Sequence, residues 1–373
     1  MTTIWKPASI SETDLDRSRL SGNQTERTPD IVSNRWFWDF APVTDADGVS
    51  YQIGESEVWL ALTAPRSDDP SGRHFVASLA VLYFAEERWS FVGELMLRHT
   101  HPGNCEWAGM AIARDSTLSV FFTSAGLRGL PGGYQQRLWT AACPIEILES
   151  PASDHQFTRA HEVLDAAHGP YLPADQRTGQ PGMIRAFRDP FYFQSGENRS
   201  EYLVFTASSV DATSRYNGAI GYAEFSHSAG SWEHRGAIIV SDDVATELER
   251  AHVIENDGLY YLFWSTPAYA FRPGLEYPTG LYGAVSDSLD GDFRLLNDTG
   301  LVLANPVDRP FQQYSWFVSR DLSVQGFVDL PDCSSAALAE GPPDANDVFS
   351  GTAGPRYSIV LDGDHARVST AEL

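Results

Sequence analysis

The feature that most constrains the fold of this chain is a short apolar segment that recurs five times. The segments are residues 57–64, 118–125, 201–208, 259–266 and 324–330. Each is rich in Val, Tyr, Phe, Leu and Thr, as β-strands are, and four of the five end in a predicted turn containing Thr or Ser. Most are followed by further strand-like segments, such as 219–225 with 234–240, or 280–285 with 293–303. Strand groups that recur every few tens of residues are typical of a β-propeller.

Five repeats predict an all-β, five-bladed β-propeller with a central axial pocket. A two-sheet sandwich is the alternative, but it does not predict one unit repeated five times. We expect a single domain over residues 1–373, in which residues 1–33 form an N-terminal extension that packs on the propeller. Helical periodicity is scarce, and it predicts short helices only at 11–20 and 157–167.

The charge of the chain excludes some partners. The formal net charge is −24, which disfavours binding to nucleic acid or to an anionic membrane. Lys6 is the only lysine among the 26 basic residues. An acidic, lysine-poor surface is typical of proteins that work in concentrated salt, where screening weakens self-repulsion. An acidic protein from a GC-rich genome is the alternative, because such genomes also favour arginine.

The sequence shows no clear motif for membrane insertion, secretion or metal binding. No apolar run approaches the length of a membrane span, and residues 1–19 lack the basic head and apolar region of a secretory signal. The three cysteines have spacings that match no zinc or redox motif. We therefore expect no metal, no cofactor and no membrane partner, and we expect a monomer.

Three acidic strings, far apart in sequence, set carboxylates beside aromatic or arginine residues. They are Trp38-Asp39-Phe40-Ala41-Pro42, Phe187-Arg188-Asp189-Pro190 and Glu247-Leu248-Glu249-Arg250. A single Asp or Glu is usually a solvated surface charge, and this chain has 50 of them. Carboxylates packed with aromatic rings and guanidinium groups, however, are typical of sites that hold sugars and cleave their acetal bonds.

The repeats predict where these strings lie. Asp39 precedes the first repeat, and Asp189 and Glu249 lie about ten residues before the third and fourth. Trp107 and Tyr314 have the same place before the second and fifth. Because the first strand of each propeller blade lines the central channel, each blade is predicted to contribute one of these residues to a shared axial pocket.

The residue types indicate a retaining glycosidic mechanism, which needs two carboxyl groups about 5–5.5 Å apart. The short Asp39, beside Trp38, fits the nucleophile. The longer Glu249 fits the acid/base, and nearby acidic charges are expected to raise its pKa. Asp189, beside Arg188, fits a group that hydrogen-bonds sugar hydroxyls in the transition state.

Five motifs in this order resemble glycoside hydrolase family 68, the levansucrases, inulosucrases and related β-fructofuranosidases. The motifs are Trp38-Asp39 with Pro42, Glu106-Trp107-Ala108-Gly109, Arg188-Asp189-Pro190, Glu247-Leu248-Glu249-Arg250 and Tyr314-Ser315. The resemblance implies a five-bladed propeller in which Asp39 is the nucleophile, Asp189 the transition-state stabiliser and Glu249 the acid/base. The substrate-binding residues it implies are Trp38, Trp107, Ala108, Arg188, Glu247, Arg250 and Tyr314.

Some positions depart from the family pattern. Ala108 replaces a serine that commonly hydrogen-bonds the nucleophile, so Asp39 is expected to be held differently. The basic residue usual on the glucosyl side is missing near Thr266, and Arg272 is a candidate substitute. Met183 or its neighbours replace the acidic residue of the calcium site found in Gram-positive members, which again implies no required metal.

The resemblance implies a sucrose-using fructosyltransferase that passes a fructosyl unit to fructan or oligosaccharide acceptors. The halophilic composition and short chain resemble haloarchaeal members, so we expect an inulosucrase forming β-2,1 linkages. A levansucrase forming β-2,6 linkages and a hydrolytic β-fructofuranosidase remain alternatives in the same chemical class. A non-catalytic sugar-binding propeller is the alternative from another class. The resemblance implies an extracellular protein, although no signal peptide is visible and the sequence alone leaves the location unknown.

Overall fold

The computed structural model describes residues 2–20, 29–151, 157–179, 182–333 and 349–369. Strands dominate this part of the chain, so the predicted all-β class is confirmed. The first predicted helix is present as α1 (Glu12–Ser18), where Ser11 and Asp14 form a reciprocal capping box. The second predicted helix is wrong, because residues 157–167 contribute strand β10 (Thr158–Leu164), which pairs with the edge of its neighbour β9. Pairing with this edge overrides the local preference.

The strands form antiparallel meanders that follow the chain. The first contains β2 (Arg35–Thr44), β4 (Ser56–Pro65), β5 (Ser78–Ala85) and β6 (Arg88–Glu94), with β3 (Gln52–Ile53) paired to β4. The second contains β7 (Cys105–Arg114), β8 (Thr117–Ala125), β9 (Gln136–Pro144) and β10. The third contains β11 (Phe187–Gln194), β12 (Glu201–Ser208), β13 (Gly218–Ser226) and β14 (Ser231–Ser241).

Two further meanders complete the described part of the fold. The fourth contains β15 (Glu249–Asn256), β16 (Leu259–Thr266) and β17 (Gly280–Ser286), and β17 also pairs with β18 (Arg294–Leu295) and β19 (Leu301–Ala304). The fifth contains β20 (Gln313–Val318), β21 (Ser323–Val328), β22 (Thr352–Asp362) and β23 (His365–Val368). Short 3-10 turns occur at Pro70–Phe75, Leu97–His99, Ile145–Leu148, Ala166–His168, Ala268–Ala270 and Leu296–Asp298.

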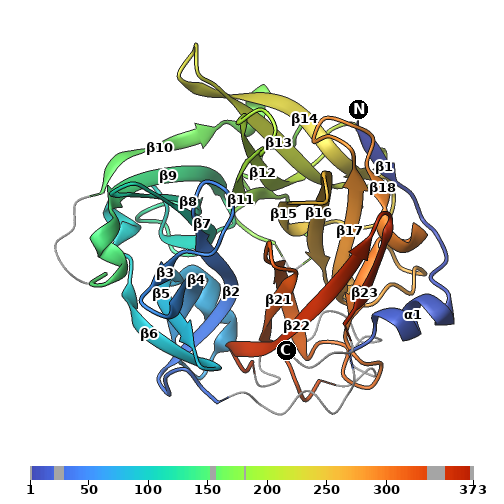
Figure 1. The fold of residues 1–373 in the computed structure, drawn as a ribbon, viewed down its shortest axis with the longest axis horizontal. Coiled ribbons are helices and arrows are strands. Elements are labelled where there is room, and N and C mark those ends of the chain that lie inside the picture. The colour runs from blue at the N-terminus through green and yellow to red at the C-terminus, as the bar shows by residue number, and fades with distance from the viewer. Residues whose placement is uncertain (1, 21–28, 152–156, 180–181, 334–348, 370–373) are drawn as a thin grey trace.

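The meanders succeed one another around a common centre, in a β-propeller-type arrangement (Figure 1). The first two are joined into one sheet by a short parallel pairing of β2 with β7 at Val43 and Thr44. Every predicted repeat coincides with the second strand of a meander, namely β4, β8, β12, β16 and β21. The recurrence in the sequence therefore reflects one strand position that is buried in the same way each time.

The N-terminal segment is tied to the third meander. Strand β1 (Thr3–Trp5) pairs in parallel with β14 and extends that sheet at its edge. Trp5 is fully buried, and its ring lies 5.4 Å from those of Trp264 and Tyr282. Aromatic side chains of this size remove a large apolar area from water, so β1 is anchored by packing as well as by hydrogen bonds.

Candidate active site

The first strand of every meander carries a one-residue β-bulge at the same place. The register shifts lie between Trp38 and Ala41, Trp107 and Gly109, Arg188 and Phe191, Glu249 and His252, and Tyr314 and Phe317. A bulge inserts one unpaired residue and turns nearby side chains away from the regular pleat. Such bulges occur often beside active sites, and here they place the candidate residues.

In four of the five bulges, the residue after the last regular pair has left-handed backbone. These residues are Asp39 (φ 55°), Asp189 (φ 58°), Arg250 (φ 57°) and Ser315 (φ 56°). A positive φ is uncommon for residues with a Cβ atom and is favoured mainly for Asn and Asp. The four strands therefore share an unusual local geometry that is set by the fold.

This geometry corrects one prediction. The sequence pattern predicts that Asp39, Trp107, Asp189, Glu249 and Tyr314 occupy one equivalent position. In the register of the sheets, the equivalent residues are instead Trp38, Trp107, Arg188, Glu249 and Tyr314. Asp39 and Asp189 lie one residue later, at the left-handed position. Each meander thus presents two successive residues, and the catalytic candidates come from both positions.

The Arg188 guanidinium contacts carboxyl groups of both the second and the third acidic string. Its Nη2 lies 2.6 Å from Glu249 Oε1 and 3.2 Å from Glu247 Oε2, and its Nε lies 3.6 Å from Asp189 Oδ2. Its side chain is only 5% exposed. Burial alone would lower the pKa of Arg188, but the surrounding carboxylates raise it above its ordinary value, so the guanidinium stays charged. The predicted convergence of these strings is present in the structure.

Asp189 is held from several sides. Its Oδ2 accepts hydrogen bonds from the Thr206 hydroxyl and from the backbone N–H of Arg250, both at 3.1 Å. Its own backbone N–H donates to Thr123 Oγ1 at 2.9 Å. Burial raises the pKa of Asp189 to about 6, although the Arg188 guanidinium acts in the opposite direction. The orientation of this carboxyl group is therefore fixed before any ligand binds.

Asp39 reaches the same region from the first meander. Burial raises the pKa of Asp39, and the nearby Glu249 charge adds to this effect, while Arg250 and the Ser315 side chain lower it. Arg250 also braces the backbone here, because its Nη2 donates to the carbonyls of Asp39 at 3.2 Å and Phe40 at 2.9 Å. The Asp39 carboxyl group thus lies within electrostatic reach of Glu249.

The protonation of the two glutamates differs from the prediction. Burial would raise the pKa of Glu249, but Arg188 and the Tyr314 hydroxyl, which donates to Glu249 Oε2, outweigh burial and lower it. The expectation of a raised pKa at Glu249 is therefore wrong for the unliganded protein. Burial instead raises the pKa of Glu247 well above its ordinary value. The pKa values of the two glutamates are thus shifted in opposite directions, so Glu247 holds a proton more tightly than Glu249 does.

The two predicted tryptophans and Ala108 lie in the first two meanders. The Trp107 Nε1–H donates to the His74 carbonyl at 2.6 Å, and the Trp38 ring lies 6.1 Å from the His74 ring. Both tryptophans are buried, with 8% and 3% exposure respectively. Ala108 is also buried and offers only a methyl group at the bulge.

The sequence analysis missed several charged or titratable residues of the site, among them Arg73, Asp329 and His74. Arg73 lies over the Phe349 ring at 3.7 Å and interacts electrostatically with Asp39 and Asp329. Burial raises the pKa of Asp329 to about 7. Burial also lowers the pKa of His74 well below its ordinary value, so that ring is neutral. None of these residues belongs to the acidic strings, so no sequence signal identified them.

The raised pKa values at the site lower the excess of negative over positive charge. The arginines Arg73, Arg188 and Arg250 face the carboxyl groups of Asp39, Asp189, Glu247, Glu249 and Asp329. The raised pKa values of Glu247 and Asp329 reduce the negative charge that the three guanidinium groups have to compensate. Such compensation is needed because an unpaired buried charge is costly.

Two further predictions concern a basic residue on the glucosyl side and a metal site. Arg272 does not reach the carboxylates named above, because its Nη1 forms a 3.1 Å ion pair with Asp243 near the surface. The suggestion that Arg272 serves the glucosyl side is therefore not supported. Within the described ranges, no group of three or more His, Cys, Asp or Glu side chains could hold a metal ion. None of the helices in those ranges has both the length and the apolar character needed to cross a membrane.

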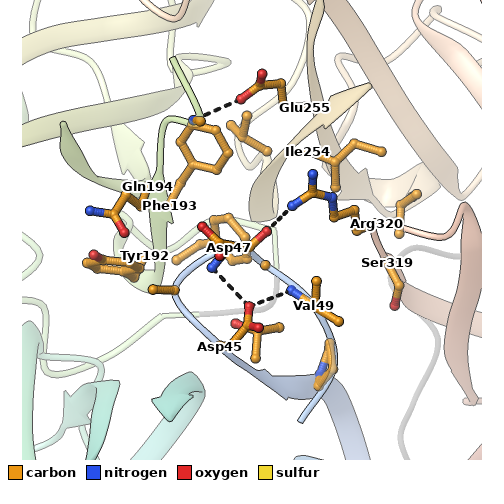
Figure 2. A pocket seen from close by; sticks show the side chains of 18 of the residues that line it. Asp45, Asp47, Val49, Tyr192, Phe193, Gln194, Ile254, Glu255, Ser319 and Arg320 are labelled. Atoms are coloured by element: carbon orange, nitrogen blue, oxygen red, sulfur yellow. Dashed lines mark hydrogen bonds between the residues drawn. The ribbon is translucent and has the colours of Figure 1, made fainter. Parts of the chain in front are cut away.

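A cavity of about 570 Å³ lies at the opposite end of the inner strands (Figure 2). It is lined by residues near the C-terminal ends of β2, β11, β15 and β20, including Gln194, Ile254 and Ser319. The candidate site residues lie near the N-terminal ends of β11, β15 and β20 and at the bulge in β2. A loop crosses this cavity where Asp47 pairs with Arg199 and accepts a hydrogen bond from Arg320 through its carbonyl. The cavity is therefore separate from the carboxylate cluster.

The family model, the related sequences and the similar structures all indicate the same protein family. The family model described as Levansucrase/Invertase matches residues 8–225 and 210–372. Levansucrase Lscbeta from Pseudomonas syringae pv. actinidiae is 26% identical, over 98% of this chain and 90% of the relative. The structure of an inulosucrase from Halalkalicoccus jeotgali bound to kestose is 30% identical with a TM-score of 0.79, covering 99% of this chain and 95% of that one.

A levansucrase structure from Gluconacetobacter diazotrophicus, 20% identical with a TM-score of 0.76 over 93% of this chain and 83% of that one, shares the fold. The family model, in contrast, extends over both the fold and the carboxylate strings of this chain. The chain therefore belongs to glycoside hydrolase family 68, the levansucrase/invertase family, and is an enzyme of the fructosyltransferase type represented by levansucrases and inulosucrases.

Proposed function

We propose that this enzyme transfers fructosyl units from sucrose through a covalent fructosyl-enzyme, with retention at the anomeric carbon. The observation that carries the proposal is the convergence of three carboxyl groups from three meanders. Arg188 contacts Asp189 and Glu249, and the charge of Glu249 acts on Asp39. A nucleophile and an acid/base at one buried site are the requirements of a retaining glycosidic reaction.

In the proposed first step, a carboxylate oxygen of Asp39 bonds to the anomeric carbon of the fructosyl unit. The bond from that carbon to the glucosyl oxygen breaks, and Glu249 donates a proton to the leaving oxygen. Asp189 hydrogen-bonds the fructosyl hydroxyls and stabilises the oxocarbenium-like transition state. In the second step, the hydroxyl oxygen of a sugar acceptor attacks the same carbon, the bond from that carbon to Asp39 breaks, and the acceptor hydroxyl gives its proton to Glu249.

The glutamate pair supplies the proton for this cycle. The pKa of Glu247 is raised and that of Glu249 is lowered in the unliganded site, and Arg188 contacts both, so the pair favours the proton on Glu247. The glucosyl oxygen needs a proton from Glu249, so the proton of the pair moves to Glu249 when sucrose displaces the Tyr314 and Arg188 contacts. The pair thus titrates as a unit.

The proposal includes a fold assignment. The five antiparallel meanders of the described residues correspond to five blades, with Trp38, Trp107, Arg188, Glu249 and Tyr314 around the axial pocket. Trp38, Trp107, Ala108, Arg188, Glu247, Arg250 and Tyr314 would form the binding surface for sucrose. Residues 1–373 would act as one catalytic domain whose N-terminal extension, residues 1–33, is attached through β1.

We further propose inulosucrase specificity, with β-2,1 linkages in the product. The 30% identity to an inulosucrase structure supports this choice, as does the coverage of 99% of this chain. The relative from Pseudomonas syringae pv. actinidiae is named a levansucrase, which makes β-2,6 linkage the competing assignment. Nuclear magnetic resonance of the product distinguishes the two linkages directly. Size measurement by light scattering tests the expectation of a monomer.

One assay tests the activity. The protein is incubated with sucrose in concentrated salt, and released glucose and fructose are measured separately. Glucose in excess over fructose supports transfer, whereas equal amounts identify a hydrolytic β-fructofuranosidase. Binding of sucrose without release of either sugar would identify a non-catalytic sugar-binding protein and overturn the proposal.

A further inference from the structure

Buried hydroxyl side chains occupy one register position in three successive meanders. Thr123, Thr206 and Ser265 lie in the second strands β8, β12 and β16. Each is paired with the last regular residue before a bulge, namely Trp107, Arg188 and Glu249. Each of the three side chains is fully buried. The sequence interpretation assigned such residues to turns, whereas the structure places these three within strands.

Each of these hydroxyl groups bonds to the first strand of the next meander or to the residue directly before it. Thr123 Oγ1 accepts from the Asp189 N–H at 2.9 Å. The Thr206 hydroxyl donates to the Leu248 carbonyl at 2.9 Å. Ser265 Oγ accepts from the Trp316 N–H at 3.1 Å. The second meander is thereby bonded to the third, the third to the fourth and the fourth to the fifth.

Thr206 has an additional contact that the other two lack. Its hydroxyl lies 3.1 Å from Asp189 Oδ2 as well as 2.9 Å from the Leu248 carbonyl, which directly precedes Glu249. A hydroxyl group carries one proton, so that proton is shared between the two acceptors. Thr206 is therefore bonded both to one carboxyl group of the site and to the backbone beside another.

The first and fifth meanders have no hydroxyl group at this position. Leu62 and Phe327 pair with Trp38 and Tyr314 there. The first bulge is instead braced across the site by the Arg250 guanidinium at the Asp39 and Phe40 carbonyls. A hydroxyl group thus connects Asp189 to the backbone beside Glu249, in addition to the Arg188 contacts, whereas Arg250 contacts the backbone at Asp39.

We propose that Thr206 is a positioning residue for the transfer reaction, and that Thr123, Thr206 and Ser265 form a hydroxyl ladder that fixes the relative placement of Asp189 and Glu249. The inference rests on the proposed function for the roles of these two carboxyl groups. Small displacements of positioned groups have large effects on rate, because the transition state requires a narrow range of geometries. The ladder limits such displacements because its hydroxyl groups bond to main-chain groups of the neighbouring meander.

The test compares three variants in concentrated salt with sucrose. Thr206→Val keeps the shape of the side chain but removes the hydroxyl, and we expect kcat to fall by about 10- to 100-fold with a much smaller change in KM. Thr206→Ser restores the hydroxyl and should recover most of kcat. The matched control is Thr140→Val, because the buried Thr140 hydroxyl bonds to the Val120 carbonyl within the second meander.

The pH profile separates positioning from a general loss of stability. Removal of the Thr206 hydroxyl takes a hydrogen bond from the ionised Asp189 carboxylate, so the pKa of Asp189 rises. The acidic limb of the activity profile of Thr206→Val should therefore shift to higher pH. Thr140→Val should leave that limb unchanged. An unshifted limb with wild-type kcat in Thr206→Val would overturn the proposal, as would an equal loss of kcat in Thr140→Val.

Failure of the proposed function is distinguishable from failure of the ladder. If the wild-type protein releases no sugar from sucrose, the proposed function is wrong. Crystal structures of the wild type and Thr206→Val then decide the structural part of the inference. A displaced Asp189 carboxyl group and Leu248 carbonyl in the variant support the ladder, whereas unchanged positions of both groups overturn it.

Discussion

The Nη2 atom of Arg188 lies 2.6 Å from Oε1 of Glu249, in a contact whose side chains are 5% and 19% exposed. The contact joins residues from neighbouring meanders that occupy equivalent positions before their bulges. In the proposed mechanism, Arg188 keeps Glu249 ionised until sucrose arrives. The contact therefore lowers the pKa of Glu249 and also connects the third meander to the fourth at the site.

Replacement of Arg188 tests this dual role. Arg188→Lys keeps a positive charge but loses the planar guanidinium that contacts three carboxyl groups. We expect kcat/KM for sucrose to fall by about 10³-fold, comparable to the loss of a transition-state donor. Arg235→Lys is the control, because Arg235 pairs with Glu224 outside the site. Activity within a few-fold of wild type in Arg188→Lys would contradict the role assigned to the guanidinium.

The nucleophile assignment predicts a severe loss from a small change. Asp39→Asn keeps the shape and the tolerance for left-handed backbone but removes the attacking carboxylate. Glucose release should fall by about 10⁴-fold, because the covalent route is lost. Asp115→Asn changes another aspartate with positive φ (54°) in an exposed turn, and it should leave the rate unaltered. An active Asp39→Asn enzyme would rule out the proposed mechanism.

The two glutamates should differ in their pH dependence. Glu249→Gln should abolish activity at every pH, because the proton donor is gone. In Glu247→Gln, Glu249 keeps a pKa lowered by Arg188 and Tyr314, so it is protonated only in more acidic solution. The basic limb of kcat should therefore move to lower pH by about one unit or more. The exposed Glu146→Gln is the control, and an unmoved limb in Glu247→Gln would contradict the shared proton.

Ionisation of the buried Asp329 should lower the free energy of unfolding as the pH rises. Its pKa is raised from 3.8 to about 7 by burial, so the folded state binds this proton more tightly than the unfolded state does. The resulting stability is complete below about pH 4 and is lost as the pH rises through about 7. Asp329→Asn stays neutral, so its gain in free energy of unfolding over wild type should be near zero at pH 4 and up to about 4 kcal/mol at pH 8.

Urea denaturation in concentrated salt at these two pH values measures that difference. The control is Asp362→Asn, which changes a residue at the end of β22 outside the carboxylate cluster. Equal stability of Asp329→Asn and wild type at pH 8 would show that the buried carboxyl group carries no penalty.

The surface charge predicts a dependence on salt. With a net charge of −24, self-repulsion is strong at low ionic strength and is screened when the salt concentration is high. Folding and sucrose cleavage should both decline as potassium chloride is reduced from molar concentrations, which circular dichroism and glucose release can follow together. Full structure and activity in dilute buffer would contradict the halophilic interpretation.

Much of the fold was readable from the chain because one strand pattern recurs. The five predicted repeats all became second strands of meanders, since their apolar residues are buried on both faces of the sheets. The error at 157–167 has a different origin. Its sequence is compatible with a helix, and the available edge of β9 decided in favour of β10.

The candidate site was only partly predictable. Asp39, Asp189 and Glu249 were identified from their aromatic and arginine neighbours in the sequence. Arg73 and Asp329 carry no such local signal, and they enter the site only because the turn after β4 and the end of β21 lie beside it. The direction in which the pKa of Glu249 shifts was likewise not predictable, because it depends on contacts with Arg188 and Tyr314 from other meanders.

The sequence by itself determined the strand repeat, the acidic composition and the identity of the carboxyl groups, because these follow from local residue types and their spacing. The tertiary structure decided which residues share a register, in which direction the pKa values of Glu247 and Glu249 shift and how hydroxyl groups connect neighbouring strands. These properties depend on the bulges and on desolvation at the shared site. Both arise from contacts between residues far apart in the chain, so they exist only after the meanders have come together.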